Sequence, residues 1–481
     1  MSRKKGSVAD LAWLSALKPG QGPRYQQIAQ QVIDAVREER LRPGDRLPPQ
    51  RELAQQLGVD LTTVTRAYNA LRSAGMLTVQ GARGTYIASA ALVPEDAGFT
   101  VDLSMNIPPL TDSPAFGRAL QVAAAHAHAR VASDALMSYH VGPGAGVDRE
   151  AGAQWLRPAL GPLDRSRIIV CGGAQTALAA LILAYSREGD TVLTEAMTYP
   201  GLLAAAGTQR RHIQAVAGDQ EGMLPEALEQ ACMARRPALI YLNPTMQNPT
   251  AATLSAQRRA ALYEVASRHQ VGIIEDDPYW LLADDAPAPI ATLQREGAAP
   301  VYYVCTLSKT LAPGLRTAYI AMPAQASAAS VLDALRSLTL MPAAWMTAVA
   351  TELIESGVAA QWLATVREEL AARQTLAAAI LPAQARGNPH GLHRWLPLPA
   401  GWDEYRLTRA AQGQGLGVTP SAAFSAVDQI SNALRISLGA RATGIRWRGG
   451  YDGWLPFWRT PPCKGSRAWF DWFDSMLVRH A

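Results

Sequence analysis

Lysine is nearly absent from the interior of this sequence. The chain contains 45 lysine and arginine residues, and only five of them are lysines. Four of the five lie near the ends of the chain, at positions 4, 5, 18 and 464, so Lys309 stands alone in the long stretch between them. Because arginine supplies the positive charge everywhere else, we infer that position 309 needs a primary amine, which can lose its proton where a guanidinium cannot.

Other features are also missing. No stretch approaches the roughly 18 consecutive apolar residues of a membrane-spanning helix. Residues 1–20 lack the apolar segment and small-residue cleavage site of a secretory signal. The four cysteines have neither the paired spacing of a metal site nor that of a disulfide framework. We therefore expect a cytoplasmic protein with free thiols, no metal site and no membrane contact.

The positive charge is concentrated in the first fifth of the chain. Residues 1–90 carry 13 basic and 7 acidic side chains, a net charge of +6, whereas the remainder carries 32 basic and 33 acidic ones, a net of −1. A local positive field of this kind suits a polyanionic partner. A basic surface that contacts only solvent would give the same count of charges, so the charge alone does not establish a polyanionic partner.

Residues 24–87 have the pattern of three helices followed by a hairpin. Apolar side chains recur at helical spacing over residues 24–41, and the prolines and glycine of "RPGDRLPPQ" then break the helix. A short helix is predicted over residues 51–58 and a third over residues 59–75, where Asp60 is a candidate N-cap. The alternating "MLTVQGARGTYIA" predicts a two-stranded wing.

Helix, tight turn and helix is the arrangement in which the second helix lies in the major groove of DNA. Short hydroxyls and arginines on that helix can reach base edges and phosphates, and Arg83 lies at the tip of the predicted wing. A purely structural three-helix unit is the alternative. The predicted DNA contacts are Arg51, Thr62, Thr63, Thr65, Arg66 and Arg83.

From residue 102 to about 440, apolar strand-like runs alternate with helical stretches, which predicts an α/β sheet. The predicted strands lie in "RIIVCGG", "TVLTEA", "ALIYLNP", "VGIIEDD" and "VYYVCTLS". Ligands of open α/β sheets bind at the C-terminal ends of the strands. Glycines and polar residues cluster at those ends here, so we expect the site there.

Lys309 follows the last of these strands, and a lysine amine can form a Schiff base with an aldehyde. Asp276 ends the strand before it, where a buried carboxylate can pair with the protonated ring nitrogen of pyridoxal 5'-phosphate. Tyr279 and Asn248 are placed to hydrogen-bond the phenolic oxygen of the same cofactor. Pyridoxal 5'-phosphate is therefore the predicted cofactor.

The cofactor's phosphate and ring need further partners. A helix begins after the glycine pair of "VCGGAQTAL", and its first amides make an anion site. Arg435, near the end of the chain, is a candidate clamp for the carboxylate of an amino acid. The remaining predicted cofactor residues are Tyr199, which would stack on the ring, and the phosphate donors Ala174, Gln175, Thr306, Ser308 and Arg316.

The N-terminal region of three predicted helices and a hairpin resembles the winged helix-turn-helix of GntR-type bacterial transcription regulators over some sixty residues. The family's Pro-Ser/Pro-x-Arg-x-Leu-Ala signature is matched by Pro48, Pro49, Arg51, Leu53 and Ala54. Leu61 departs from the pattern, because members often carry arginine or another polar residue there. The departure removes one direct DNA contact and leaves the assignment of DNA binding unchanged.

Residues 102–440 resemble the fold-type I aminotransferases in their ordered set of glycine turn, Asn, Asp-x-x-Tyr, Ser-Lys and Arg. The resemblance implies that Lys309 is the Schiff-base lysine. It also implies that Tyr139, in "MSYHVGPGAG", reaches the phosphate of the neighbouring subunit. Ala174 departs from the usual phosphate turn, which has a serine there, so one hydroxyl is missing.

The two parts together resemble the MocR subfamily of regulators. The resemblance implies a homodimer, often with exchanged heads, that binds a double-stranded DNA operator and responds to pyridoxal 5'-phosphate or a small amino compound. The main alternative is an active aminotransferase with an accessory DNA-binding head. A third hypothesis is a DNA-binding architectural protein whose enzyme domain is inactive. The predicted boundaries are 1–90 for the head with its core at 22–87, 91–101 for a linker, 102–440 for the aminotransferase-like domain and 441–481 for an atypical tryptophan-rich tail.

Overall fold

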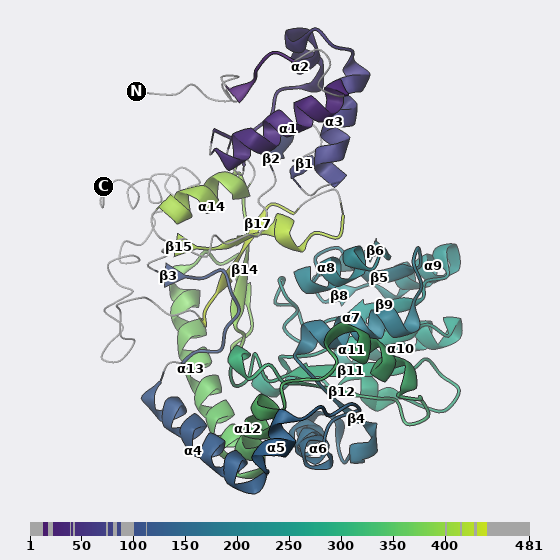
Figure 1. Ribbon diagram of the computed structural model, residues 1–481, viewed down its shortest axis with the longest axis vertical. Coiled ribbons are helices and arrows are strands. Elements are labelled where there is room, and N and C mark those ends of the chain that lie inside the picture. The colour runs from purple at the N-terminus through teal and green to yellow at the C-terminus, as the bar shows by residue number, and fades with distance from the viewer. Residues whose placement is uncertain are drawn as a thin grey trace.

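The computed structural model describes residues 13–17, 23–38, 40–41, 44–73, 76–79, 84–87, 101–111, 113–399, 402–413, 416–427 and 431–439. These residues form an N-terminal head, a large domain and a smaller C-terminal domain (Figure 1). Three of the predictions fall outside the described residues: Arg83, the tail at 441–481 and all of the linker except Val101.

The head is a winged helix-turn-helix, as predicted. Its elements are α1 (Arg24–Arg37), α2 (Gln50–Leu57), α3 (Leu61–Ser73) and the antiparallel strands β1 (Leu77–Val79) and β2 (Thr85–Ile87). Gly58 ends α2 in the left-handed conformation, with φ of 60°. Trp13, 2% exposed, joins the apolar core, and its carbonyl accepts a hydrogen bond from Arg40 Nη1. The apolar core of the head therefore includes a residue that precedes α1.

A seven-stranded sheet forms the centre of the large domain, in the order β4-β12-β11-β10-β9-β5-β6. Its strands are β4 (Ile168–Cys171), β5 (Thr191–Glu195), β6 (His212–Val216), β9 (Leu239–Leu242), β10 (Gly272–Asp276), β11 (Val301–Thr306) and β12 (Ala318–Ala321). Only β12 runs antiparallel to its neighbours in this sheet. The sequence predicted five of these strands and missed β6 and β12.

Helices cover both faces of this sheet. They are α4 (Pro114–Arg130), α5 (Ser133–Met137), α6 (Gly146–Leu160), α7 (Ala174–Tyr185), α8 (Pro200–Thr208), α9 (Pro225–Arg235), α10 (Ala256–His269), α11 (Ala329–Thr339) and α12 (Ala344–Glu355). Tyr302 and Val304 of β11 pack with α7 and α11, whereas Tyr303 and Cys305 pack with α6 and α12. Burial on both faces explains why β11 is a continuous apolar run and does not alternate.

The long helix α13 (Val358–Ile380) leads into the small domain. Its sheet has the order β13 (Arg386–Gly387), β14 (His393–Pro397), β17 (Ala433–Ser437) and β16 (Thr419–Pro420). The chain arriving from the head joins this domain at β3 (Val101–Asp102), which pairs with β15 (Leu416–Gly417). None of the helices in the described ranges is long and apolar enough to cross a membrane.

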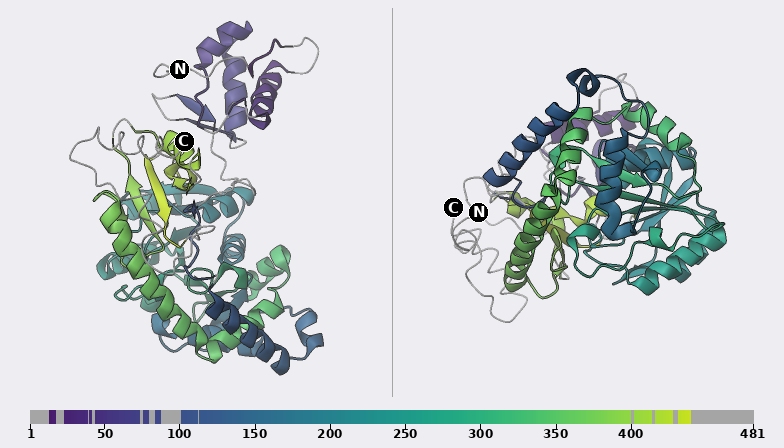
Figure 2. Two further views of the ribbon diagram at one scale, coloured as in Figure 1. Left: turned by 90° about the vertical axis from the view of Figure 1, so that its left-hand side faces the viewer. Right: turned by 90° about the horizontal axis from the view of Figure 1, so that it is seen from below.

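The head contacts the small domain through helix α14 (Glu404–Gly413), as Figures 1 and 2 show. Asp45 Oδ1 accepts a hydrogen bond from Arg409 Nη1 at 2.7 Å. Beside it Gly44, with φ of 81°, lies so close to α14 that a Cβ atom there would be 2.9 Å from Tyr405 Cβ. Only glycine fits this position, because both the backbone angle and the spacing exclude a side chain.

Candidate functional site

Lys309 lies in the turn after β11, at the C-terminal edge of the parallel strands, where the sequence predicted the site. Its Nζ donates a hydrogen bond to the backbone O of Asn106 at 2.6 Å. Burial, together with the nearby charge of Arg435, lowers the pKa of Lys309 to about 8. About a tenth of the amine is therefore neutral at pH 7, far more than for an unperturbed lysine, and a nucleophilic lysine requires this neutral form.

Asp276 ends β10 and is 4% exposed. Its Oδ2 accepts a hydrogen bond from Tyr241 Oη at 2.7 Å, whereas its Oδ1 is buried without a hydrogen-bond partner. Burial raises the pKa of Asp276 to about 7, although the Tyr241 bond acts in the opposite direction. A cationic N–H placed at Oδ1 would satisfy that oxygen and keep the carboxylate ionised.

Asn248 and Arg435 meet although they are far apart in the sequence. Arg435 Nη1 donates to Asn248 Oδ1 at 2.8 Å, and Arg435 Nη2 donates to the backbone O of Ser104. The guanidinium lies 4.8 Å from the centre of the Phe424 ring, and its Nε is buried without a partner. Burial lowers the pKa of Arg435 to about 10. This cationic group has no carboxylate in direct contact among the described residues, so a ligand carboxylate could complete it.

Asn106 links several of these groups, and the sequence gave no signal for it. Its Nδ2 is 3.3 Å from Tyr279 Oη and 3.0 Å from His393 Nδ1, and its Oδ1 is buried without a partner. Tyr241 and His393 were missed for the same reason: each contacts the site from a distant part of the chain, and neither belongs to a local motif.

Three of the predicted phosphate donors meet at the N-terminus of α7: Ala174 and Gln175 begin the helix, and Arg316 Nη2 donates to the backbone O of Gly172 at 3.0 Å. Gly173, with φ of 105°, lies so close to Arg316 that a Cβ atom there would be 2.6 Å from Arg316 Nη2. Thr306 Oγ1 donates to Ser308 Oγ at 3.0 Å. The side-chain nitrogen of Gln175, the second residue of α7, uses one of its two N–H groups to donate to the backbone O of Gly201 at 2.8 Å. The arrangement fits a phosphate at a helix N-terminus.

Two predicted tyrosines lie in different surroundings. Tyr199 is the N-cap residue of α8 at the same edge of the sheet, and burial raises the pKa of its hydroxyl, as does the nearby charge of Asp276. Tyr139, by contrast, is 79% exposed, and the single chain does not bring it to the site.

The predicted DNA contacts that lie within the described residues are on α2 and α3. Arg51, Thr62 and Arg66 are exposed, and Thr63 is half-buried. The guanidinium of Arg66 lies 4.2 Å from the centre of the Tyr25 ring, which restricts its directions. Thr65 is also half-buried, and its hydroxyl donates to Gln50 Oε1 at 2.7 Å. In this arrangement Thr65 can only accept a hydrogen bond from DNA.

Comparison with known proteins agrees with both parts of the chain. Residues 24–87 match the bacterial regulatory proteins of the gntR family, and residues 100–444 match aminotransferase class I and II. The chain belongs to the MocR subfamily of GntR-type regulators. The MocR head is a DNA-binding domain, and the fold of the MocR large domain is that of the aminotransferases that use pyridoxal 5'-phosphate.

Several relatives that match most of the length of this chain are named as transcription regulators. An uncharacterized HTH-type transcriptional regulator, YdeF of Bacillus subtilis, is 26% identical over 90% of this chain and 94% of its own. The vitamin B6 salvage pathway transcriptional repressor PtsJ of Salmonella typhimurium is 31% identical over 85% of this chain and 94% of its own. This MocR chain is therefore a transcription regulator with an aminotransferase-like domain, and the enzyme alternative is not favoured.

Among solved structures, LysN, an α-aminoadipate aminotransferase of Thermus thermophilus, is similar to the MocR large domain. It is 25% identical with a TM-score of 0.63, and the match covers 71% of this chain and 87% of that one. That structure is complexed with N-(5'-phosphopyridoxyl)-L-leucine. The buried, unpaired Asp276 Oδ1 and the close approach at Gly173 show that the residues of this chain fit the same type of cofactor.

The pKa of Lys309 leads to a pH-dependent prediction. Only the neutral amine attacks an aldehyde, and the lowered pKa of about 8 places its deprotonation near that pH. The rate at which pyridoxal 5'-phosphate attaches should rise about tenfold per pH unit up to about pH 8 and level off above it. Stopped-flow absorbance measures this rate, with free Nα-acetyl-lysine as the control. A rate that keeps rising beyond pH 9, as for an unperturbed lysine, would contradict the lowered pKa.

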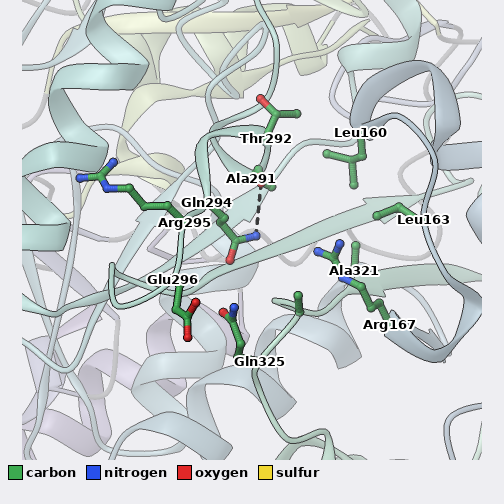
Figure 3. A pocket seen from close by; sticks show the side chains of 11 residues that line it. Leu160, Leu163, Arg167, Ala291, Thr292, Gln294, Arg295, Glu296, Ala321 and Gln325 are labelled. Atoms are coloured by element: carbon green, nitrogen blue, oxygen red, sulfur yellow. Dashed lines mark hydrogen bonds between the residues drawn. The ribbon is translucent and has the colours of Figure 1, made fainter.

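A separate hollow of about 270 Å³ lies at the opposite edge of the sheet (Figure 3). Arg167, which precedes β4, and Gln294, which bonds the start of β11, line it. Arg295 also lines it and pairs with Glu264 at 2.7 Å. None of the predicted cofactor residues borders this hollow, so it is distinct from the site around Lys309.

Proposed function

We propose that this protein is a cytoplasmic, homodimeric regulator that holds pyridoxal 5'-phosphate on Lys309 and changes its affinity for a DNA operator when the cofactor or an amino compound binds. The cofactor supplies an aldehyde for the lysine amine when bound. Asp276 would hold its ring nitrogen, and Asn248 and Tyr279 its phenolic oxygen. The contact of Asn248 with Arg435 carries the proposal, because it joins a residue predicted to hold the cofactor to the residue predicted to bind a carboxylate.

Exposed apolar side chains support the homodimer. Met137, Tyr139 and Val141 are 74%, 79% and 51% exposed, and Leu340 is 41% exposed. Val141 and Leu340 line one groove, and the backbone N–H of His140 lies 3.1 Å from the sulfur of Met341, so these two segments are neighbours. A second copy of the chain would cover this apolar surface. In such a dimer Tyr139 would reach the site of the partner subunit.

The contact between head and small domain supports the regulatory part. Arg435 lies on β17, and Glu404, at the start of α14, accepts a hydrogen bond from the backbone N–H of Ala433 on the same strand. The same helix carries Arg409, which pairs with Asp45 of the head. The ligand clamp and the head are therefore attached to adjoining elements of the small domain. A ligand that favours one position of this domain would bias the head.

Arg435→Ala tests the proposal. The wild type should change its operator affinity at least about fivefold on addition of pyridoxal 5'-phosphate or of an amino acid. The variant should keep its basal operator affinity and its cofactor absorbance, but lose the response to carboxylate-bearing amino compounds. Fluorescence anisotropy with DNA selected by the full-length protein measures both affinities.

Arg394→Ala is the matched control. Arg394 is a half-buried arginine of β14 that bonds Gln374 and lies outside the predicted site. It should respond as the wild type does. If the wild-type affinity is unchanged by the cofactor and by every amino acid, while amino and keto acids are interconverted over many turnovers, the protein is an aminotransferase with an accessory head.

A further inference from the structure

A buried histidine fixes the orientation of the Asn106 amide. His393 Nε2 lies 3.1 Å from the backbone O of Gln247, which can only accept, so Nε2 carries the proton. Burial, with the charge of Arg435 nearby, lowers the pKa of His393 to about 3, so the ring is neutral and its Nδ1 is an acceptor. Asn106 Nδ2, 3.0 Å from Nδ1, must therefore be the donor of that pair.

This orientation leaves Asn106 Oδ1 as an acceptor without a donor. The side chain is 4% exposed, and Oδ1 has no hydrogen-bond partner in the structure. A buried acceptor that stays unpaired destabilises the structure, because it has lost its hydrogen bonds to water. Flipping the amide would not help, because it would place Oδ1 against the unprotonated Nδ1 of His393. The oxygen is therefore satisfied most simply by a donor that the ligand brings.

The neighbours of Asn106 indicate which donor that is. Its backbone O accepts the hydrogen bond from Lys309 Nζ, so the residue stands directly beside the lysine amine. Arg435 donates to the backbone O of Ser104, two residues earlier. The segment from Ser104 to Asn106 therefore contacts both the lysine amine and the predicted carboxylate clamp. An amine that takes the place of Lys309 Nζ meets the backbone O of Asn106, and its side-chain Oδ1 belongs to the same residue.

We propose that Asn106 determines specificity for the amino group of the bound compound. Its Oδ1 accepts a hydrogen bond from the N–H of that group while Arg435 binds the carboxylate. The inference rests on the proposed function and narrows its ligand class to compounds that carry both an amine and a carboxylate. A carboxylate without an amine leaves Oδ1 unpaired, so it binds more weakly.

The test compares two probes on the full-length protein. N-(5'-phosphopyridoxyl)-L-leucine carries an N–H and a carboxylate, whereas pyridoxal 5'-phosphate alone carries neither at that position. Asn106→Ala and Asn106→Leu should each weaken the leucine adduct about 10- to 100-fold, as expected for a lost hydrogen bond to a charged group. Binding of pyridoxal 5'-phosphate should change by less than about threefold, because the variants keep the backbone O at residue 106. Calorimetry and absorbance measure the two dissociation constants.

Asn388→Leu is the control, since Asn388 makes its side-chain contact with the backbone N–H of His390. It should bind both probes as the wild type does. If the Asn106 variants lose the same affinity for both probes, Asn106 only maintains the shape of the pocket. If their affinity for the leucine adduct is unchanged, Oδ1 accepts no hydrogen bond from its amino group. Either result overturns the proposal. A separate measurement tests the proposed function itself. If neither probe changes the operator affinity of the wild type, the proposed function is wrong, whatever the Asn106 variants show.

Discussion

Lys309→Ala should abolish the visible absorbance of the lysine-bound cofactor completely. The only amine at the strand ends is removed, and no other lysine occurs between positions 18 and 464. The fold should persist, because one partly buried side chain is shortened and its single described hydrogen bond, to Asn106 O, is lost. The absorbance spectrum of protein purified with added pyridoxal 5'-phosphate measures this result.

Borohydride sharpens the experiment. In the wild type, reduction should attach the cofactor permanently and increase the protein's mass, whereas the variant should gain no mass. Lys309→Arg is the matched control, because it keeps the positive charge but has no amine that can attack an aldehyde. It should behave as Lys309→Ala does. A mass gain in either variant would place the attachment on another group and contradict the assignment of Lys309.

Combined replacement of Arg51 and Arg66 by alanine should nearly eliminate specific operator binding. An arginine that contacts a base contributes about 1–3 kcal/mol, and each lost phosphate contact should reduce the slope of log affinity against log salt by roughly 0.9. Both side chains are exposed on the helices of the head. Fluorescence anisotropy over a series of salt concentrations measures affinity and slope together.

Arg210→Ala provides the control for charge. Arg210 is an exposed arginine of the large domain that pairs with Glu188 at 3.1 Å, so the variant removes one positive charge far from the predicted face in sequence. Its affinity and salt slope should equal those of the wild type. Unchanged binding in the Arg51 and Arg66 variant would mean that DNA lies on a different face of the head.

The sequence predicted the parts of the site that belong to local motifs. Asp276 ends one buried strand and Lys309 lies in the turn after the next. Because strand ends of one sheet meet at one edge, their proximity follows from the α/β pattern alone. Arg435 was predicted as a clamp because its guanidinium can bind a carboxylate with two hydrogen bonds, and the structure brings it to Asn248. The roles of these residues remain predictions.

Other contacts had no local signature. Asn106 and His393 meet across a sequence separation of 287 residues, and neither has a spacing that marks it. Strand β12 runs antiparallel within an otherwise parallel sheet, and Trp13 packs on the head from outside the periodic helices. These features depend on tertiary contacts, which hydrophobic periodicity does not encode.

The contact of Gly44 and Asp45 with α14 limits how freely such proteins can be recombined. A chimera that carries a different DNA-binding head would still read its own operator, since α2 and α3 travel with it. Its head would meet Tyr405 and Arg409, however, and any side chain at position 44 would collide with Tyr405. Coupling between ligand and DNA would then be lost while both binding activities survive. Transplanted heads should therefore be chosen with a glycine and an acidic residue at these two positions.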